Sequence, residues 1–135
     1  MSKQLILVSH GRFCEELKKS AEMIMGPQEM IATVTLLPEE GEDDFLEKFE
    51  VITEPLADFI VFADLFGGTP CNILSKKIMQ GASFELYAGM NLPMVISYVN
   101  DNLLATTSDY VKESVESIVN VNQLLLDMVV DDEDE

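Results

Sequence analysis

Residues 59–70 read Phe-Ile-Val-Phe-Ala-Asp-Leu-Phe-Gly-Gly-Thr-Pro, an apolar run followed by a carboxylate, two glycines and a proline. Residues 59–63 contain no polar side chain, which is typical of a strand that is covered on both faces in a parallel sheet. Apolar residues at helical spacing follow Pro70, and Gly81 lies just beyond them. This part of the chain therefore predicts a buried strand, a loop and a helix.

The rest of the chain repeats the same alternation. Apolar runs predict strands at 5–8, 30–37 and 84–88, and helical spacing predicts helices at 13–25, 45–52, 91–100 and 109–119. Strands alternating with helices predict an α/β fold, namely a three-layer, doubly wound, mostly parallel sheet of four strands. Right-handed crossovers bring the carboxyl ends of the first and third strands to the same edge of this sheet.

Length and composition indicate one domain. The chain has 135 residues and is 47% hydrophobic, enough for a core without a disulfide or a metal. The apolar residues at 121–130 fit either a strand or a helix. Residues 131–135 are all acidic and are predicted to be solvated and mobile. The predicted organisation is therefore a domain over 1–130 followed by a disordered acidic tail over 131–135.

The charge balance restricts the partners. The chain has 25 Asp and Glu against 8 Lys and Arg, a net charge of −17. Such a surface repels nucleic acid and anionic lipid, and it attracts a basic protein partner. Two cysteines are too few for a disulfide framework, and we find neither a signal peptide nor a membrane span. We therefore expect a cytoplasmic protein whose thiols are reduced.

The only histidine, His10, follows the first predicted strand just as Asp64 follows the third. Open α/β sheets bind ligands at these strand ends. A carboxylate that accepts from one ring nitrogen leaves the lone pair of the other nitrogen pointing outward as a nucleophile. His10 and Asp64 are thus the candidate catalytic residues. The alternatives are a histidine that satisfies a local hydrogen bond and an aspartate that caps a turn.

The loop after Asp64 suits an anion. Its two glycines allow a ligand close to the main chain, Thr69 is predicted to cap the next helix, and Pro70 suits the first turn of that helix. Free N–H groups there, such as those of Cys71 and Asn72, would form an anion cradle. An ordinary junction between a loop and a helix would use the same residues. The candidate phosphate-binding residues are Gly11, Gly67, Gly68, Thr69 and Cys71.

Other ligands are not indicated. The chain lacks the glycine-rich nucleotide motifs, so a phosphoryl group would come from a protein rather than from ATP. His10, Asp64 and the two cysteines lack zinc-ligand spacing, and we interpret Cys14 and Cys71 as packing residues. The only arginine, Arg12, either neutralises a phosphoryl group or faces solvent and a partner; we favour the second.

Two motifs occur here in the order found in one known family. They are Ser9-His10-Gly11 near the start and Asp64-Leu65-Phe66-Gly67-Gly68-Thr69-Pro70 after the third strand. The segments Ala21-Glu22-Met23 and Ala88-Gly89-Met90-Asn91-Leu92-Pro93-Met94 accompany them. On these motifs the chain resembles, over nearly its whole length, the enzyme IIA component of the mannose family of the bacterial phosphoenolpyruvate-dependent sugar phosphotransferase system.

The resemblance implies a function. The phosphocarrier protein HPr would phosphorylate His10, which would pass the group to a IIB component for sugar phosphorylation. Asp64 would orient the ring through Nδ1 so that Nε2 accepts the phosphoryl group, and Thr69 would help to hold it. No cofactor is implied, and the membrane components IIC and IID would be indirect partners that determine the sugar. Position 12 is often aromatic in the family, so Arg12 departs from its pattern.

The resemblance also implies a homodimer in which residues 121–130 form an antiparallel strand exchanged between subunits. Two other functions stay open. The first is the IIA-like phosphoryl donor of dihydroxyacetone kinase, although the Gly67-Gly68-Thr69-Pro70 turn favours the sugar branch. The second is a non-catalytic flavodoxin-like module that binds an anion or cofactor in the same crevice, with His10 only as a contact.

Overall fold

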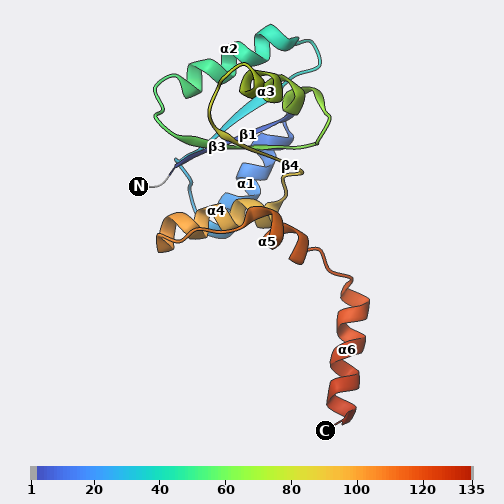
Figure 1. The fold of residues 1–135 in the computed structure, drawn as a ribbon. Helices are drawn as coiled ribbons and strands as arrows, with labels where there is room; N and C mark the ends of the chain where they lie inside the picture. Colours follow the sequence, from blue (N-terminus) through green and yellow to red (C-terminus); the bar gives the residue numbers. More distant parts are fainter. Residues whose placement is uncertain (1–2, 135) are drawn as a thin grey trace.

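The computed structural model describes residues 3–134. A central sheet contains four parallel strands in the order β2-β1-β3-β4 (Figure 1). They are β1 (Gln4–His10), β2 (Ile31–Leu36), β3 (Phe59–Ala63) and β4 (Glu85–Ala88). The predicted α/β fold with a four-stranded parallel sheet is confirmed, and β3 has the predicted bounds.

Helices cover both faces of the sheet. Figure 1 shows α2 (Glu42–Thr53) and α3 (Thr69–Met79) on one side, and α1 (Phe13–Met25), α4 (Leu92–Leu104) and α5 (Tyr110–Glu116) on the other. The alternating side chains of β1 serve the two cores. Leu5 and Leu7 pack in the core with α1 and α4, whereas Ile6 and Val8 pack in the core with α2 and α3. A strand buried on both faces needs an uninterrupted apolar run.

The last element corrects one prediction. Residues 121–130 belong to a helix, α6 (Val121–Asp134), which projects away from the sheet (Figure 1). The predicted antiparallel strand is therefore wrong for this chain. In the part of the chain that the structure describes, no strand lies beside residues 121–130, and a helix satisfies their backbone hydrogen bonds internally. The Asn120 side chain assists by accepting from the N–H of Gln123 at 3.1 Å.

Some predictions about the chain ends remain untested. An exchange between subunits involves a second copy and stays a prediction, as do the domain boundary at residue 130 and the mobility of the acidic tail. Glu135, the last residue of that tail, lies outside the described residues. Among residues 3–134, no helix is both long and apolar enough to cross a membrane.

Candidate functional site

His10 and Asp64 meet at the carboxyl edge of the sheet. Because β1 and β3 are neighbours in parallel register, with Val8 opposite Ala63, the residues that follow their buried parts lie side by side. Asp64 Oδ2 accepts from the backbone N–H of His10 at 3.0 Å and lies 2.8 Å from Nδ1 of its ring. The predicted meeting of these two residues is confirmed. A proton on Nδ1 donates to the carboxylate and leaves the lone pair on Nε2.

The two side chains differ in exposure. The His10 side chain is 47% exposed, whereas that of Asp64 is only 12% exposed. The second carboxylate oxygen of Asp64, Oδ1, is buried and has no hydrogen-bond partner among the described residues. The carboxylate therefore makes its hydrogen bonds through Oδ2 alone, both of them to His10. A buried carboxylate with few other donors stabilises positive charge that develops on the ring.

Gly68 is required by space rather than by backbone angle. A Cβ atom at this position would lie 2.7 Å from Cε1 and 3.4 Å from Nε2 of His10. Gly68 is buried, and its main chain forms a wall against the imidazole. Gly67 differs, because its φ of 83° favours glycine. The two neighbouring glycines thus serve two purposes, a turn at 67 and close contact with the ring at 68.

The start of α3 differs in two details from the prediction. Gly68 is the N-cap and Thr69 is the first helical residue, so the predicted capping by Thr69 is wrong. The helix begins one residue early because the extended Gly68 supplies the first carbonyl, which accepts from the N–H of Asn72 at 2.9 Å. The Asn72 N–H is therefore not free, contrary to prediction. The Asn72 side chain also closes the loop by donating to the Gly67 carbonyl at 3.1 Å.

Several backbone N–H groups around the start of α3 are not engaged by other backbone groups. Those of Gly67, Thr69 and Cys71 have no backbone acceptor among the described residues, and Thr69 is exposed. The other two predicted phosphate-binding residues use their N–H groups within the protein. Gly11 donates to the Leu36 carbonyl at 2.7 Å, and Gly68 donates to the Leu65 carbonyl at 3.1 Å. Their N–H groups are already engaged. Gly11 instead forms the turn after β1, with a φ of 57°.

Sequence reasoning missed the role of Ser9. This residue is fully buried, and its hydroxyl donates to the Gly11 carbonyl at 3.0 Å and accepts from the N–H of Cys14 at 2.8 Å. The hydroxyl thereby binds the turn after His10 to the first turn of α1. A polar residue at the end of an otherwise apolar run was the available signal.

The side chains of the cysteines and the arginine form no hydrogen bond to His10 or Asp64 among the described residues. Cys14 is buried in the core beside α1, and Cys71 is buried in the core on the opposite face of the sheet. Burial raises the pKa of the Cys14 thiol. Arg12 is exposed and pairs with Glu15 at 2.9 Å. Among the described residues, no three side chains of the types that bind metals are grouped together.

Comparison with known proteins establishes the family. The family model EIIA-man, described as "PTS system fructose IIA component", matches residues 4–119. The chain belongs to the EIIA-man family. The resemblance stated from its motifs is thus confirmed, and this EIIA-man protein is a IIA component of the mannose, sorbose and fructose family of phosphotransferase systems. Proteins of this class are components of phosphotransferases.

Individual proteins similar to this EIIA-man chain belong to the same class of component. The mannose-specific EIIAB component of Escherichia coli strain K12 is 29% identical over 112 residues, covering 81% of this chain and 33% of that protein. The chain therefore spans about a third of the first relatives that it matches. The sorbose-specific EIIA component of Lacticaseibacillus casei is 30% identical, with 77% of this chain and 78% of that protein covered.

Solved structures are also similar to this EIIA-man chain. The mannose/sorbose-specific IIA subunit from Enterococcus faecalis has a TM-score of 0.76 and 30% identity, covering 89% of this chain and 95% of the other. A IIA protein associated with the fucose utilization operon from Streptococcus pneumoniae has a TM-score of 0.81 and 25% identity, covering 93% and 97%.

In this EIIA-man protein, large apolar side chains are exposed in the loop that follows Asp64. Leu65 is 59% and Phe66 is 85% exposed, and the Leu65 carbonyl lies against Gly68. Phe13, at the start of α1, is also exposed. Large apolar side chains exposed on the same part of a surface are typical of a contact with another protein.

Proposed function

We propose that this protein is a cytoplasmic phosphoryl carrier of a sugar phosphotransferase system. His10 accepts a phosphoryl group from phospho-HPr and passes it to a IIB component, which phosphorylates the incoming sugar together with the membrane components IIC and IID. The observation that supports this proposal best is the 2.8 Å contact between Nδ1 of His10 and Oδ2 of Asp64. That contact leaves Nε2 as the nucleophile on a side chain that a protein partner can reach.

The proposed step is an in-line displacement at phosphorus. The bond between phosphorus and the donor's nucleophile breaks as the bond from Nε2 to phosphorus forms, and Nδ1 keeps its proton throughout. The ring becomes more positive, and Asp64 stabilises that charge. The N–H groups of Gly67, Thr69 and Cys71 and the Thr69 hydroxyl bind the phosphoryl oxygens at the start of α3. Transfer to the IIB component is the same displacement in reverse.

The direct test is phosphorylation by phosphoenolpyruvate, enzyme I and HPr. The wild-type protein gains one phosphate, which is labile in acid, and it donates that phosphate to a sugar IIB component. His10→Ala gains none, although circular dichroism shows an unchanged fold because the side chain is partly exposed. Equal labelling of the alanine variant would contradict the proposal. Donation to a dihydroxyacetone kinase subunit instead of IIB would replace the sugar branch by the kinase branch.

We further propose a homodimer that forms through α6. The helix exposes the apolar side chains Leu124, Leu125, Leu126, Met128, Val129 and Val130. An apolar groove of about 330 Å³ lies beside the edge strand β4, with Met94, Val111 and Val115 in its wall. In the proposed dimer, α6 of each copy covers the groove of the other, which removes both apolar surfaces from water.

A further inference from the structure

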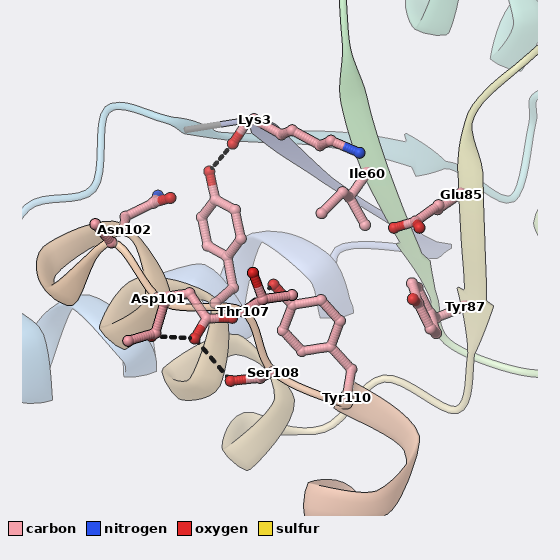
Figure 2. A pocket seen from close by; sticks show the side chains of 12 residues that line it. Lys3, Ile60, Glu85, Tyr87, Asp101, Asn102, Thr107, Ser108 and Tyr110 are labelled. Carbon is pink, nitrogen blue, oxygen red and sulfur yellow. Dashed lines mark hydrogen bonds between the residues drawn. The ribbon is translucent and has the colours of Figure 1, made fainter. Parts of the chain in front are cut away.

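A cavity of about 420 Å³ lies at the amino edge of the sheet (Figure 2). His10, the last residue of β1, lies at the opposite, carboxyl edge. Ile60 and Glu85, at the amino ends of β3 and β4, form one side of it, and the end of α4 and the loop to α5 form the other. Its volume is within the range of about 300–1,000 Å³ that is usual for small-molecule sites. None of the candidate catalytic or phosphate-binding residues lines this cavity.

The wall contains a buried carboxylate that has no cationic partner among residues 3–134. Asp101 is 8% exposed, and it forms no ion pair with the described residues. Its Oδ1 accepts from the hydroxyls of Thr106 and Ser108, both at 2.7 Å, and its Oδ2 accepts from the hydroxyl of Tyr110 at 3.1 Å. These neutral donors hold the carboxylate in place without neutralising it. Buried charges in proteins are usually paired with an opposite charge.

Aromatic rings form much of the remaining wall. They belong to Tyr87, Tyr98 and Tyr110, and the rings of Tyr87 and Tyr110 lie nearly perpendicular with centroids 5.5 Å apart. The hydroxyl of Tyr98 donates to the carbonyl of Lys3. Burial, with Asp101 nearby, raises the pKa of Tyr110, so its hydroxyl stays a neutral donor. The faces of tyrosine rings attract cations.

The charges around the opening of the cavity also favour a cation. Glu85 adds a second carboxylate, and Figure 2 shows its side chain on the opposite side of the cavity from Asp101. Lys3 is the one cationic side chain among the described residues of the wall, and its ammonium group lies 3.5 Å from Asp58. The cavity thus has two carboxylates and one ammonium group, which is already paired. This balance of charge disfavours the binding of an anion. A neutral polyol would leave the buried charge unpaired.

We propose that this cavity binds a small organic ammonium ion, with Asp101 and Glu85 as the counter-charges and the tyrosine rings as walls. The positive group lies between the two carboxylates, where it pairs with the charge that the hydroxyls leave unneutralised. This binding site is separate from the phosphoryl-transfer site and does not depend on the proposed function.

Choline and its neutral isostere 3,3-dimethylbutan-1-ol test the proposal by calorimetric titration of the full chain. They have nearly the same shape and differ in charge. We expect saturable choline binding at least about tenfold tighter than binding of the alcohol, since each tenfold corresponds to 1.4 kcal/mol. Equal binding of the two would show an apolar cavity without charge selectivity. That result, or no choline binding, would overturn the proposal.

Variants locate the binding. Glu85→Gln should weaken choline binding several-fold, and Lys3→Gln should strengthen it, because the two changes remove opposite charges from the opening. Glu47→Gln is the matched control, since it removes one exposed charge from α2 on the other face of the sheet and should have no effect. If Glu47→Gln weakens binding as much as Glu85→Gln, choline is attracted only by the net charge, and the site is disproved.

Asp101→Asn tests the buried charge itself, because asparagine keeps the shape of the side chain. We expect choline binding to fall at least about tenfold, the same scale as the loss of one charged partner. Unchanged circular dichroism and a cooperative unfolding transition in urea would show that this variant is folded. A folded Asp101→Asn variant with wild-type affinity for choline would contradict the assignment.

Discussion

The imidazole of His10 is held from two sides, by the Asp64 carboxylate at Nδ1 and by the main chain of Gly68 against Cε1. The first contact determines which nitrogen holds the proton, and the second determines where the ring lies. In the proposed reaction the other groups mainly position the phosphoryl group, as is usual for phosphoryl transfer. Substitutions at residues 64 and 68 therefore test two separable properties of one side chain.

Asp64→Asn tests the proton position. Asparagine has a similar shape but no charge, and its amide can donate to Nδ1, which would move the ring proton to Nε2. We expect the rate of phosphorylation by phospho-HPr to fall at least about tenfold, or about 1.4 kcal/mol in the barrier. Rapid-quench measurements supply the rate. Asp43→Asn is the control, because Asp43 is an exposed acid in the first turn of α2. If the Asp64→Asn variant is phosphorylated at the wild-type rate, Asp64 has no part in the mechanism.

Gly68→Ala tests the ring position. The added Cβ would lie 2.7 Å from Cε1, so the imidazole must move. Because His10 is the only histidine, its ring signals are single and unambiguous in a ¹H–¹³C NMR spectrum. We expect those signals to shift and phosphorylation to slow. Gly41→Ala adds the same methyl group in open space and should change neither. A normal rate in Gly68→Ala would show that the close contact is unimportant for transfer.

At the scale of single elements, the turn from β1 into α1 depends on the buried hydroxyl of Ser9. It bridges the Gly11 carbonyl and the Cys14 N–H, so it connects the strand that ends at His10 to the helix that follows. Replacing this hydroxyl leaves a buried N–H at a helix start without an acceptor.

Ser9→Ala should therefore lower the free energy of unfolding by about 1–3 kcal/mol, the usual cost of an unsatisfied buried donor. Urea denaturation measures this change. Ser20→Ala is the control, because Ser20 lies exposed on α1 and alanine is a better helix former. If both variants match the wild type in stability, the hydroxyl of Ser9 does not support the turn.

At the scale of the whole molecule, α6 is the one element that packs on no other part of the described chain, as Figure 1 shows. Its apolar side chains are about half exposed, which is costly for an isolated helix. The groove beside β4 is an apolar surface of the same molecule that α6 of a second copy can cover.

The dimer is tested by light scattering. The wild-type protein should have twice the mass of the 15.1 kDa chain, and Leu125→Glu should reduce it to a single chain, because a charge would enter the apolar contact. Asn122→Glu adds the same charge to the same helix at a polar position and should leave the dimer intact. A wild-type mass of one chain at micromolar concentration would contradict the proposed dimer.

The alternation of strands and helices, the parallel sheet and the meeting of His10 with Asp64 could be predicted from the order of the residues. These follow from local apolar patterns and from the handedness of crossovers, both of which are encoded by neighbouring residues. Residues 59–63 illustrate this, because an uninterrupted apolar run has few other stable places than the centre of such a sheet.

Which polar groups are free of partners depends on the three-dimensional arrangement of the chain. The Gly11 N–H donates to the Leu36 carbonyl, because the neighbouring strand supplies an acceptor that no local pattern specifies. The Asn72 N–H donates to the Gly68 carbonyl, because the helix begins one residue earlier than its local pattern indicates. The same holds for the helical state of residues 121–130, which depends on whether a strand lies beside them. The unpaired charge of Asp101 also became visible only in three dimensions, since ion pairing depends on which side chains the fold brings together.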